Sequence, residues 1–211
     1  MGSITVETLT VGQLQTNCYI IADRSTKDAI IVDPGDDADY IERIVADKHL
    51  TPIYSIATHG HFDHILAVTE LTLAYKIPFL IHKKDAFLVQ NMQRSARHFL
   101  GITVDPPPRI DRRITAKDVL KIGEANIKII ETPGHTPGSI CLFLQDEKLL
   151  FVGDLLFSGG GVGRTDFSYS NSTDLSDSLK KIFALPEDTI VYTGHGNPTT
   201  IGKERGLNVA R

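Results

Sequence analysis

The chain has 211 residues, of which 41% are hydrophobic, and a formal net charge of −4 that arises from 22 basic and 26 acidic residues. This length predicts one large domain or two small ones with a substantial core, and the charge balance disfavours nucleic acid and anionic membranes as partners. Because the sequence contains no apolar run near the ~20 residues of a membrane helix, no signal-peptide pattern and only two widely separated cysteines, we expect a cytoplasmic protein.

Short β-branched runs alternate with amphipathic segments along the chain. The runs predict nine strands, at residues 4–10, 18–22, 29–32, 53–57, 78–81, 127–131, 139–144, 149–152 and 189–192. Apolar residues at three- and four-residue spacing predict helices, at 38–48, 64–76, 85–99 and 172–185. The helix at 85–99 lies within a polar, proline-rich stretch, 83–118, which separates two halves of similar design. We therefore expect a single domain over residues 1–211, in which 83–118 forms a lid or a connecting segment.

A dense polar motif, THGHFDH, follows the predicted strand 53–57. It places His59, His61, Asp63 and His64 within six positions. In an extended loop His59 and His61 point to the same side, whereas Asp63, which could cap the next helix, and His64 turn towards a different point. One short segment can therefore supply ligands to two adjacent metal ions.

Three more polar residues follow other predicted strands: His135 in ETPGHTPGS, Asp154 in LLFVGDLLF and His195 in TIVYTGHGNP. Loops at strand ends gather at one edge of a layered α/β fold. Imidazole and carboxylate without thiolate suit zinc, iron or manganese. Any one of these histidines could be a packed or surface residue, but seven such residues in matching loops favour a metal site.

The order of these motifs, H-x-H-x-D-H, then Gly-His, Gly-Asp and Gly-His, resembles that of the metallo-β-lactamase superfamily. The likeness runs from QTNCYI and IVDPG to GHGNPTTIG. It implies an αββα four-layer sandwich, in which two face-to-face sheets lie between helices and two divalent metals lie at one edge. The resemblance implies the following ligands: His59, His61 and His135 for the first metal, Asp63, His64 and His195 for the second, and Asp154 between them.

The resemblance also implies a supporting carboxylate. Asp33 in IVDPG matches the residue that orients a ligand histidine from outside the coordination sphere. A turn residue before Pro34 is the alternative. Arg164 and Asp166 either support the site or pair with each other across the glycine-rich loop. Cys18 and Cys141 are interpreted as small core residues.

Within the superfamily, SGGGVGRTDF and GHGNPTTIGKER resemble glyoxalase II-like hydrolases, the short bacterial hydroxyacylglutathione hydrolases. This implies hydrolysis of S-D-lactoylglutathione or a related thioester by a metal-bound hydroxide, with Asp63 and Asp154 catalytic and zinc, iron or manganese as the metal. Asp154 argues against a β-lactam hydrolase, because those enzymes lack a bridging aspartate there. The alternative is a persulfide dioxygenase, since GRTDF also occurs in those enzymes, which use a single iron held by counterparts of His59, His135 and Asp154.

The sequence departs from classical glyoxalase II after His195, where only a short segment follows. We therefore do not expect the C-terminal helical domain that holds glutathione in the classical enzymes. Recognition of a small-molecule thioester then falls to 83–118. Arg94 and Arg97 on its predicted helix could contact an anionic thiol carrier, or they could form a solvated helix face.

Overall fold

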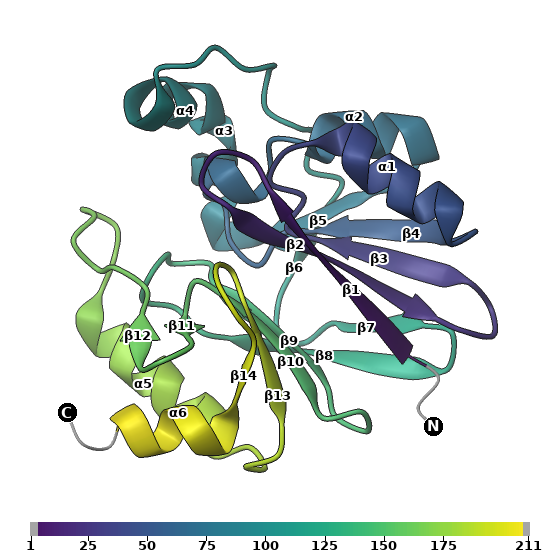
Figure 1. The fold of residues 1–211 in the computed structure, drawn as a ribbon. Coiled ribbons are helices and arrows are strands. Elements are labelled where there is room, and N and C mark those ends of the chain that lie inside the picture. Colours follow the sequence, from purple (N-terminus) through teal and green to yellow (C-terminus); the bar gives the residue numbers. More distant parts are fainter. Residues whose placement is uncertain (1–3, 209–211) are drawn as a thin grey trace.

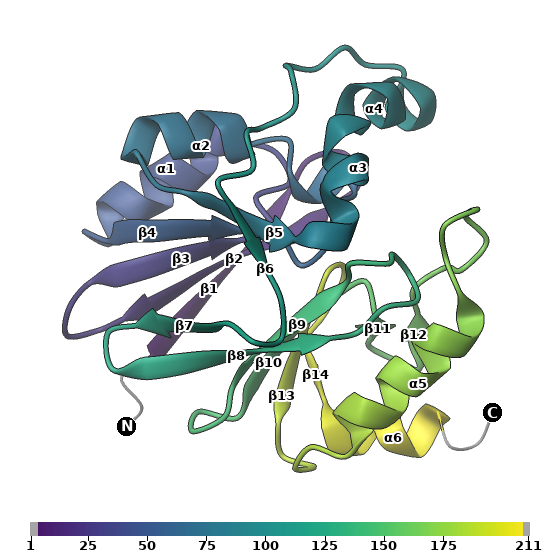
Figure 2. The same ribbon diagram turned by 180° about the vertical axis from the view of Figure 1, so that it is seen from behind.

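The structure is a computed structural model that describes residues 4–208. Two six-stranded sheets pack face to face, and helices cover the outer face of each sheet (Figures 1 and 2). The layers therefore follow the order helix, sheet, sheet, helix. This confirms the predicted αββα sandwich.

The first sheet comes from the N-terminal half and has the strand order β1-β2-β3-β4-β5-β6. Its strands are β1 (Ile4–Val11), β2 (Thr16–Asp23), β3 (Asp28–Val32), β4 (Thr51–Ile56), β5 (Phe79–His82) and β6 (Arg112–Ile114). The first three strands are antiparallel, and β3 to β6 run parallel. The carboxyl ends of the parallel strands therefore meet at one edge.

The second sheet comes from the C-terminal half and has the order β14-β13-β10-β9-β8-β7. Its strands are β7 (Val119–Ile122), β8 (Ala125–Glu131), β9 (Ile140–Leu144), β10 (Leu149–Gly153), β13 (Ile190–Thr193) and β14 (Thr199–Thr200). Only β10 and β13 pair in parallel. A two-stranded ribbon of β11 (Leu156–Phe157) and β12 (Gly161–Val162) lies beside this sheet.

Within residues 4–208, six α-helices surround the sheets: α1 (Ala38–Asp47), α2 (Val68–Tyr75), α3 (Ala86–Gln90), α4 (Met92–Leu100), α5 (Ser172–Phe183) and α6 (Ile201–Asn208). The first two cover the first sheet, the last two cover the second, and α3 and α4 lie near one edge (Figure 1). No helix within residues 4–208 is long and apolar enough to cross a membrane.

Strand β3 shows how the layers are held together. Ile30 and Val32 belong to the apolar cluster between the two sheets, whereas Ile31 belongs to the cluster beneath α1 and α2. Successive side chains of a strand point to opposite faces. Both faces of β3 are therefore buried, which explains why its sequence is continuously apolar rather than alternating.

Most predicted elements are present, but two helix boundaries were wrong. The helix predicted at 64–76 begins at Val68, because residues Phe62–His64 form a separate 3-10 turn and Asp63 does not cap it. The helix predicted at 85–99 is interrupted at Asn91, whose side-chain amide donates a hydrogen bond to the carbonyl of Phe87 (2.8 Å). The backbone N–H of Asn91 bonds the same carbonyl (3.1 Å), and such local side-chain bonds are typical of asparagine at the ends of helices.

The stretch 83–118 contains a 3-10 turn (Lys83–Asp85), α3, α4 and the short edge strand β6. The sequence patterns did not indicate β6, β7, β14, the β11–β12 ribbon or α6. All of these except α6 have four residues or fewer. Periodicity is weakly informative for such short segments.

Candidate metal centre

The seven predicted metal ligands come together at one edge of the two sheets. Four loops bring them there, and each loop follows the carboxyl end of a strand: β4, β8, β10 and β13. The strands β4 and β8 belong to different sheets. The site therefore exists only because the two halves of the chain pack against each other.

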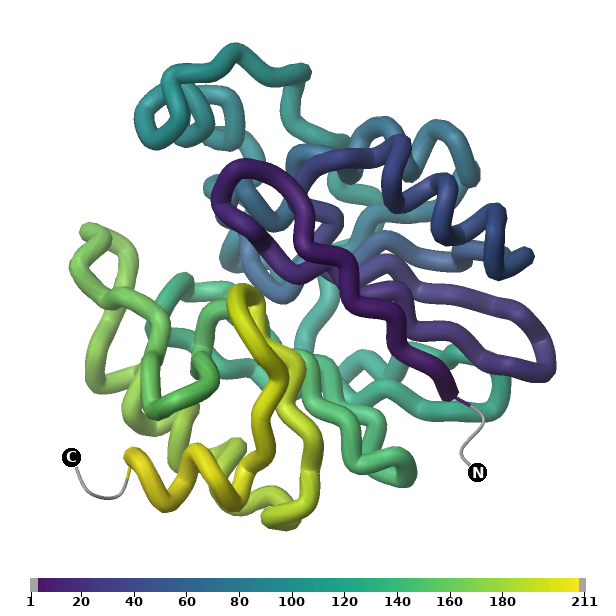
Figure 3. Tube along the Cα trace, in the orientation of Figure 1, coloured from purple at the N-terminus to yellow at the C-terminus, as the bar shows by residue number. Residues whose placement is uncertain are grey.

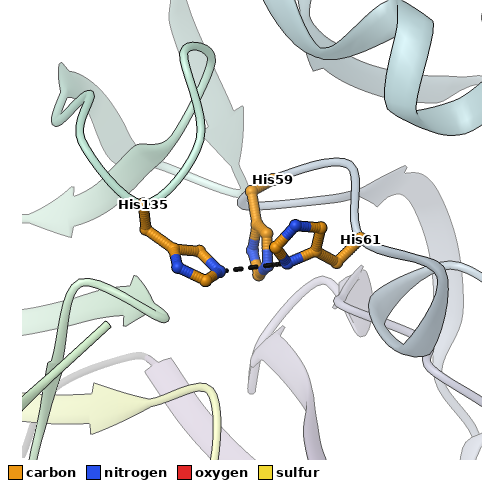
Figure 4. A group of neighbouring side chains, drawn as sticks. All are labelled: His59, His61 and His135. Atoms are coloured by element: carbon orange, nitrogen blue, oxygen red, sulfur yellow. Dashed lines mark hydrogen bonds between the residues drawn. The ribbon is translucent and has the colours of Figure 1, made fainter. Parts of the chain in front are cut away.

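His59, His61 and His135 form a three-histidine cluster (Figure 4). His61 Nδ1 lies 3.1 Å from His59 Nε2 and 3.0 Å from His135 Nε2. Burial, together with the neighbouring His135, lowers the pKa of His61 to about 3. Burial and the nearby imidazoles likewise lower the pKa of His59. Neutral imidazoles with converging nitrogens are the form in which histidine binds a metal.

Asp63, His64 and His195 form a second cluster, which we call the Asp63 cluster. Asp63 Oδ2 lies 3.7 Å from His64 Nε2 and 3.5 Å from His195 Nε2. Burial alone lowers the pKa of His64, but the carboxylates of Asp63, Asp154 and Asp33 outweigh it and raise the pKa to about 10. This cluster therefore attracts positive charge strongly.

Asp154 lies between the two clusters. Its Oδ2 is 3.7 Å from His135 Nε2, and its Oδ1 is 3.5 Å from His64 Nε2 and 3.6 Å from His195 Nε2. Oδ1 of Asp154 and Nε2 of His64 are both buried, and neither has a hydrogen-bond partner within the described residues. Buried polar atoms without partners are costly. A divalent cation bound to both atoms would satisfy them, so the donor set fits metal ions.

Two glycines leave space for the side chain of Asp154 and for the loop that follows β4. A Cβ on Gly194 would lie 2.1 Å from Asp154 Oδ1, and one on Gly153 would lie 2.2 Å from Thr58 Oγ1. Gly153 also has a φ of +52°, which disfavours other residues. Glycine at these positions therefore allows the strand ends to approach the site closely.

Asp33 fastens the loop that carries the first four ligands. Its Oδ1 accepts a hydrogen bond from the backbone of Thr58 (2.6 Å), and its Oδ2 accepts one from the Thr58 hydroxyl (2.7 Å). The same Oδ2 lies 3.1 Å from His64 Nδ1. This geometry suits a carboxylate that orients His64 so that Nε2 faces Asp154.

Asp85 was not singled out by the sequence, although it lies beside the site. Its buried carboxylate accepts hydrogen bonds from Gly60 N (2.9 Å), Thr136 Oγ1 (2.6 Å) and Gly138 N (2.6 Å). Burial raises its pKa, and these hydrogen bonds partly offset that effect. Asp85 therefore ties the loop of His59 and His61 to the loop of His135. No local pattern distinguishes it from the other charged residues of the segment 83–118.

Tyr169 is a second unpredicted neighbour. Its hydroxyl lies 2.8 Å from His61 Nε2. If Nδ1 of His61 is the nitrogen that binds metal, its proton lies on Nε2, which then donates to this hydroxyl. His135 and His195 are held by the opposite ring nitrogen. Their Nδ1 atoms face the backbone oxygens of Arg164 (2.8 Å) and Leu14 (3.1 Å), so that Nε2 faces the clusters.

The contact of His195 with Leu14 joins distant parts of the chain. Figure 3 shows the turn between β1 and β2 beside the loop that follows β13. Asn17 N donates a hydrogen bond to Gly194 O across this junction (2.8 Å). The N-terminal hairpin therefore holds the last of the seven residues in place.

A pocket of about 150 Å³ opens over the two clusters. The aromatic residues Phe62, Phe99, Phe167 and Tyr169 line it. Arg164 also lines it, with its guanidinium 4.4 Å from the centre of the Phe167 ring. Arg164 additionally pairs with Asp166 (2.6 Å), and both side chains are exposed.

The two arginines of α4 lie apart from the clusters, and they differ in the hollows that they line. Arg94 lines a hollow that adjoins the metal pocket. Arg97 lines a different hollow, together with Gln90, Gln93, Thr103 and Val104, and Arg94 forms part of that wall as well. The structure therefore distinguishes two residues that the sequence had grouped together.

Comparison with known proteins agrees with this geometry. A sequence profile described as "Metallo-beta-lactamase superfamily" matches residues 11–195. The chain belongs to this superfamily. Members of the superfamily bind divalent metals, and the His/Asp clusters described above are compatible with that property.

Two curated members of the superfamily align over almost the whole chain. The probable metallo-hydrolase YqgX of Bacillus subtilis (strain 168) is 36% identical, over 94% of this chain and 93% of its own. The hydroxyacylglutathione hydrolase GloC of Haemophilus influenzae (strain ATCC 51907) is 34% identical, over 96% of each chain.

Solved structures of the superfamily match the fold closely. The BLEG-1 B3 metallo-beta-lactamase has a TM-score of 0.90 and 36% identity, covering 97% of this chain and 98% of that one. TTHA1623 in a di-iron-bound form has a TM-score of 0.88 and 32% identity, covering 98% and 100%. ETHE1 from Myxococcus xanthus has a TM-score of 0.80 and 28% identity, covering 97% and 83%.

Proposed function

We propose that this metallo-hydrolase cleaves thioesters with two divalent metal ions, in the manner of glyoxalase II, on S-D-lactoylglutathione or a related acyl thioester. The placement of Asp154 carries the proposal, because its two oxygens face different clusters. The three-histidine cluster would hold one ion, the Asp63 cluster the other, and Asp154 both. These ligands suit zinc first, with iron or manganese as alternatives.

Bound metals supply a water of lowered pKa as nucleophile and a positive charge that polarises the carbonyl. The protein supplies orientation and a dry environment. Asp63 can orient the attacking water from its place beside His64 and His195. The aromatic walls of the pocket exclude bulk water from the reacting carbonyl, which strengthens every electrostatic interaction there.

The leaving group explains why no further side-chain acid is required. A thiolate departs readily because thiols have a pKa near 8.5. The hydroxyl of Tyr169 also lies in the pocket, and burial, together with the nearby Asp85, raises its pKa to about 12. The proposed roles therefore rest on metal ligands and their supports alone.

The curated relatives support the same reaction class. GloC is a hydroxyacylglutathione hydrolase by name, and its alignment with this chain covers 96% of each protein. We further propose that residues 83–118 act as a lid, because Ser95 and Phe99 of α4 line the metal pocket. The partner would be a small molecule rather than nucleic acid or membrane. The two unpaired, buried cysteines support a cytoplasmic location.

The direct test measures metal content and turnover together. Protein expressed without metal supplement should contain two metal ions per chain and hydrolyse S-D-lactoylglutathione. Nitrocefin serves as the comparison substrate, since BLEG-1 is described as a β-lactamase. Turnover of nitrocefin without turnover of any thioester, or a single metal ion per active chain, would contradict the proposal.

One alternative has its own geometric support. His59, His135 and Asp154 also converge, since Asp154 Oδ2 is 3.7 Å from His135 Nε2 and His59 lies within the same clusters. These three residues could hold a single iron, as expected of a persulfide dioxygenase. Oxygen uptake by the iron-loaded protein with glutathione persulfide would favour this reaction, and its absence removes it.

A further inference from the structure

The metal pocket continues into a second hollow between α4 and the loop at residues 165–170. The second hollow has a volume of about 520 Å³. Four residues line both spaces: Ser95, Phe99, Phe167 and Tyr169. A substrate whose thioester lies at the metals can therefore extend its thiol part into this hollow, which we call the outer groove.

The walls of the outer groove are rich in aromatic rings. Phe167 stacks on Tyr169 with ring centres 5.2 Å apart, and Phe87 meets Tyr169 edge-on at 5.6 Å. Phe99 is 50% exposed and Phe87 is 38% exposed, which is unusual for phenylalanine. Exposed aromatic rings around a concave surface are typical of ligand sites.

The outer groove is also positively charged. Arg94 lines it, and among residues 4–208 no aspartate or glutamate does. Arg94 makes no ion pair within residues 4–208, whereas the guanidinium of Arg164 is paired with Asp166. An unpaired guanidinium in a hollow that aromatic side chains also line suits a carboxylate or phosphate carried on a partly apolar chain.

We infer that the outer groove binds the thiol part of the substrate, and that this thiol carries a carboxylate or phosphate, which Arg94 holds. The inference rests on the proposed thioester hydrolysis, because that reaction places the acyl carbonyl at the metals. Phe99 and Phe167 contact the apolar part of the thiol. Arg97 takes no part, since it lines neither the outer groove nor the metal pocket but only the hollow beside them.

The test compares matched thioesters with matched variants. S-acetylglutathione carries carboxylates, acetyl-coenzyme A carries phosphates, and S-acetyl-N-acetylcysteamine is neutral. Arg94→Gln should raise KM about ten- to hundredfold for one of the two anionic substrates, the range expected when a hydrogen bond to a charged group is lost. The same variant should change kcat/KM for the neutral substrate less than about twofold. Arg97→Gln is the control and should affect none of the three.

The pattern of results identifies the source of the negative charge. A selective loss with S-acetylglutathione indicates a carboxylate thiol, and one with acetyl-coenzyme A indicates a phosphate thiol. Equal effects of Arg94→Gln and Arg97→Gln, or an equal loss with the neutral substrate, would overturn the inference.

A binding measurement separates this inference from the reaction itself. Calorimetry with S-methylglutathione and S-methyl-coenzyme A, which cannot be hydrolysed, requires no turnover. If either ligand binds more weakly to Arg94→Gln but not to Arg97→Gln, this supports the groove assignment even if no thioester is cleaved. If thioesters are cleaved but binding is the same in both variants, the reaction stands and the groove assignment fails.

Discussion

The two clusters at the sheet edge differ in charge and in how they are supported. In the three-histidine cluster, burial lowers the pKa of His59 and His61, which favours their neutral forms. The Asp63 cluster contains a carboxylate, and its environment raises the pKa of His64 to about 10. A cation at the first cluster would be held mainly by imidazole coordination, whereas one at the second would be held largely by charge.

The residues that hold the two clusters in place, which we call their supports, differ as well. Asp85 and Tyr169 hold the three-histidine cluster, from an N-terminal segment and a C-terminal loop. Asp33 contacts the Asp63 cluster directly through His64, and it reaches His59 only indirectly, through the Thr58 hydroxyl. A change to any one support should therefore weaken one cluster more than the other, and only a residue between them should affect both.

The largest effect is expected from Asp154→Ala. The variant should bind both metals more than about a hundredfold more weakly, beyond the loss typical of residues outside the coordination sphere, and should lose turnover. Metal analysis after dialysis and circular dichroism measure these effects, with exposed Asp146→Ala as control. Two tightly bound ions and a near-normal rate would show that Asp154 does not join the clusters.

Replacement of Asp33 by Asn should act on the Asp63 cluster. The amide cannot accept both hydrogen bonds from Thr58, so we expect a loss of about 1–3 kcal/mol in the free energy of unfolding. Metal affinity at one of the two positions should fall about 10–100-fold. A two-step metal titration and thermal unfolding measure the effects, with exposed Asp47→Asn as control. An equal loss at both positions would contradict the separation of the clusters.

Asp85→Asn should act on the opposite cluster. Three donors point at the two carboxylate oxygens, and an amide leaves one of those donors without an acceptor. We expect destabilisation of about 1–3 kcal/mol and weaker metal binding at the three-histidine cluster. Exposed Asp105→Asn, in the same segment, should change neither the unfolding temperature nor the titration. If Asp85→Asn binds both metals normally, the Asp85 carboxylate contributes to folding stability but not to metal binding.

The smallest effect is expected from Tyr169→Phe, which removes one hydroxyl and keeps the aromatic wall. Affinity at the three-histidine cluster should fall about tenfold, the lower end for partners of ligand histidines, and affinity at the Asp63 cluster should not change. The absorption spectrum of the cobalt-substituted protein reports on the same position. Tyr40→Phe is the control. An unchanged titration and spectrum would mean that Tyr169 only lines the pocket.

Local sequence determined most of the fold. Each of the nine predicted strands overlaps an observed one, because short β-branched runs are a signal that depends only on neighbours in the chain. The boundary errors at Val68 and Asn91 occurred where a turn or a side-chain hydrogen bond ended the helical pattern. Motif spacing likewise predicted that His59 and His61 point to one place, since alternate residues of an extended loop share a side.

Only the tertiary structure determined which other residues meet those histidines. Tyr169 lies 108 positions from His61, and Thr136 lies 51 positions from Asp85. Nothing in the local pattern of either residue indicates these contacts. The difference between Arg94 and Arg97 is also tertiary, because it depends on the loop at 165–170 that faces one side of α4. Secondary structure follows from short-range periodicity, whereas the support of the site depends on packing between two sheets that are separate in the sequence.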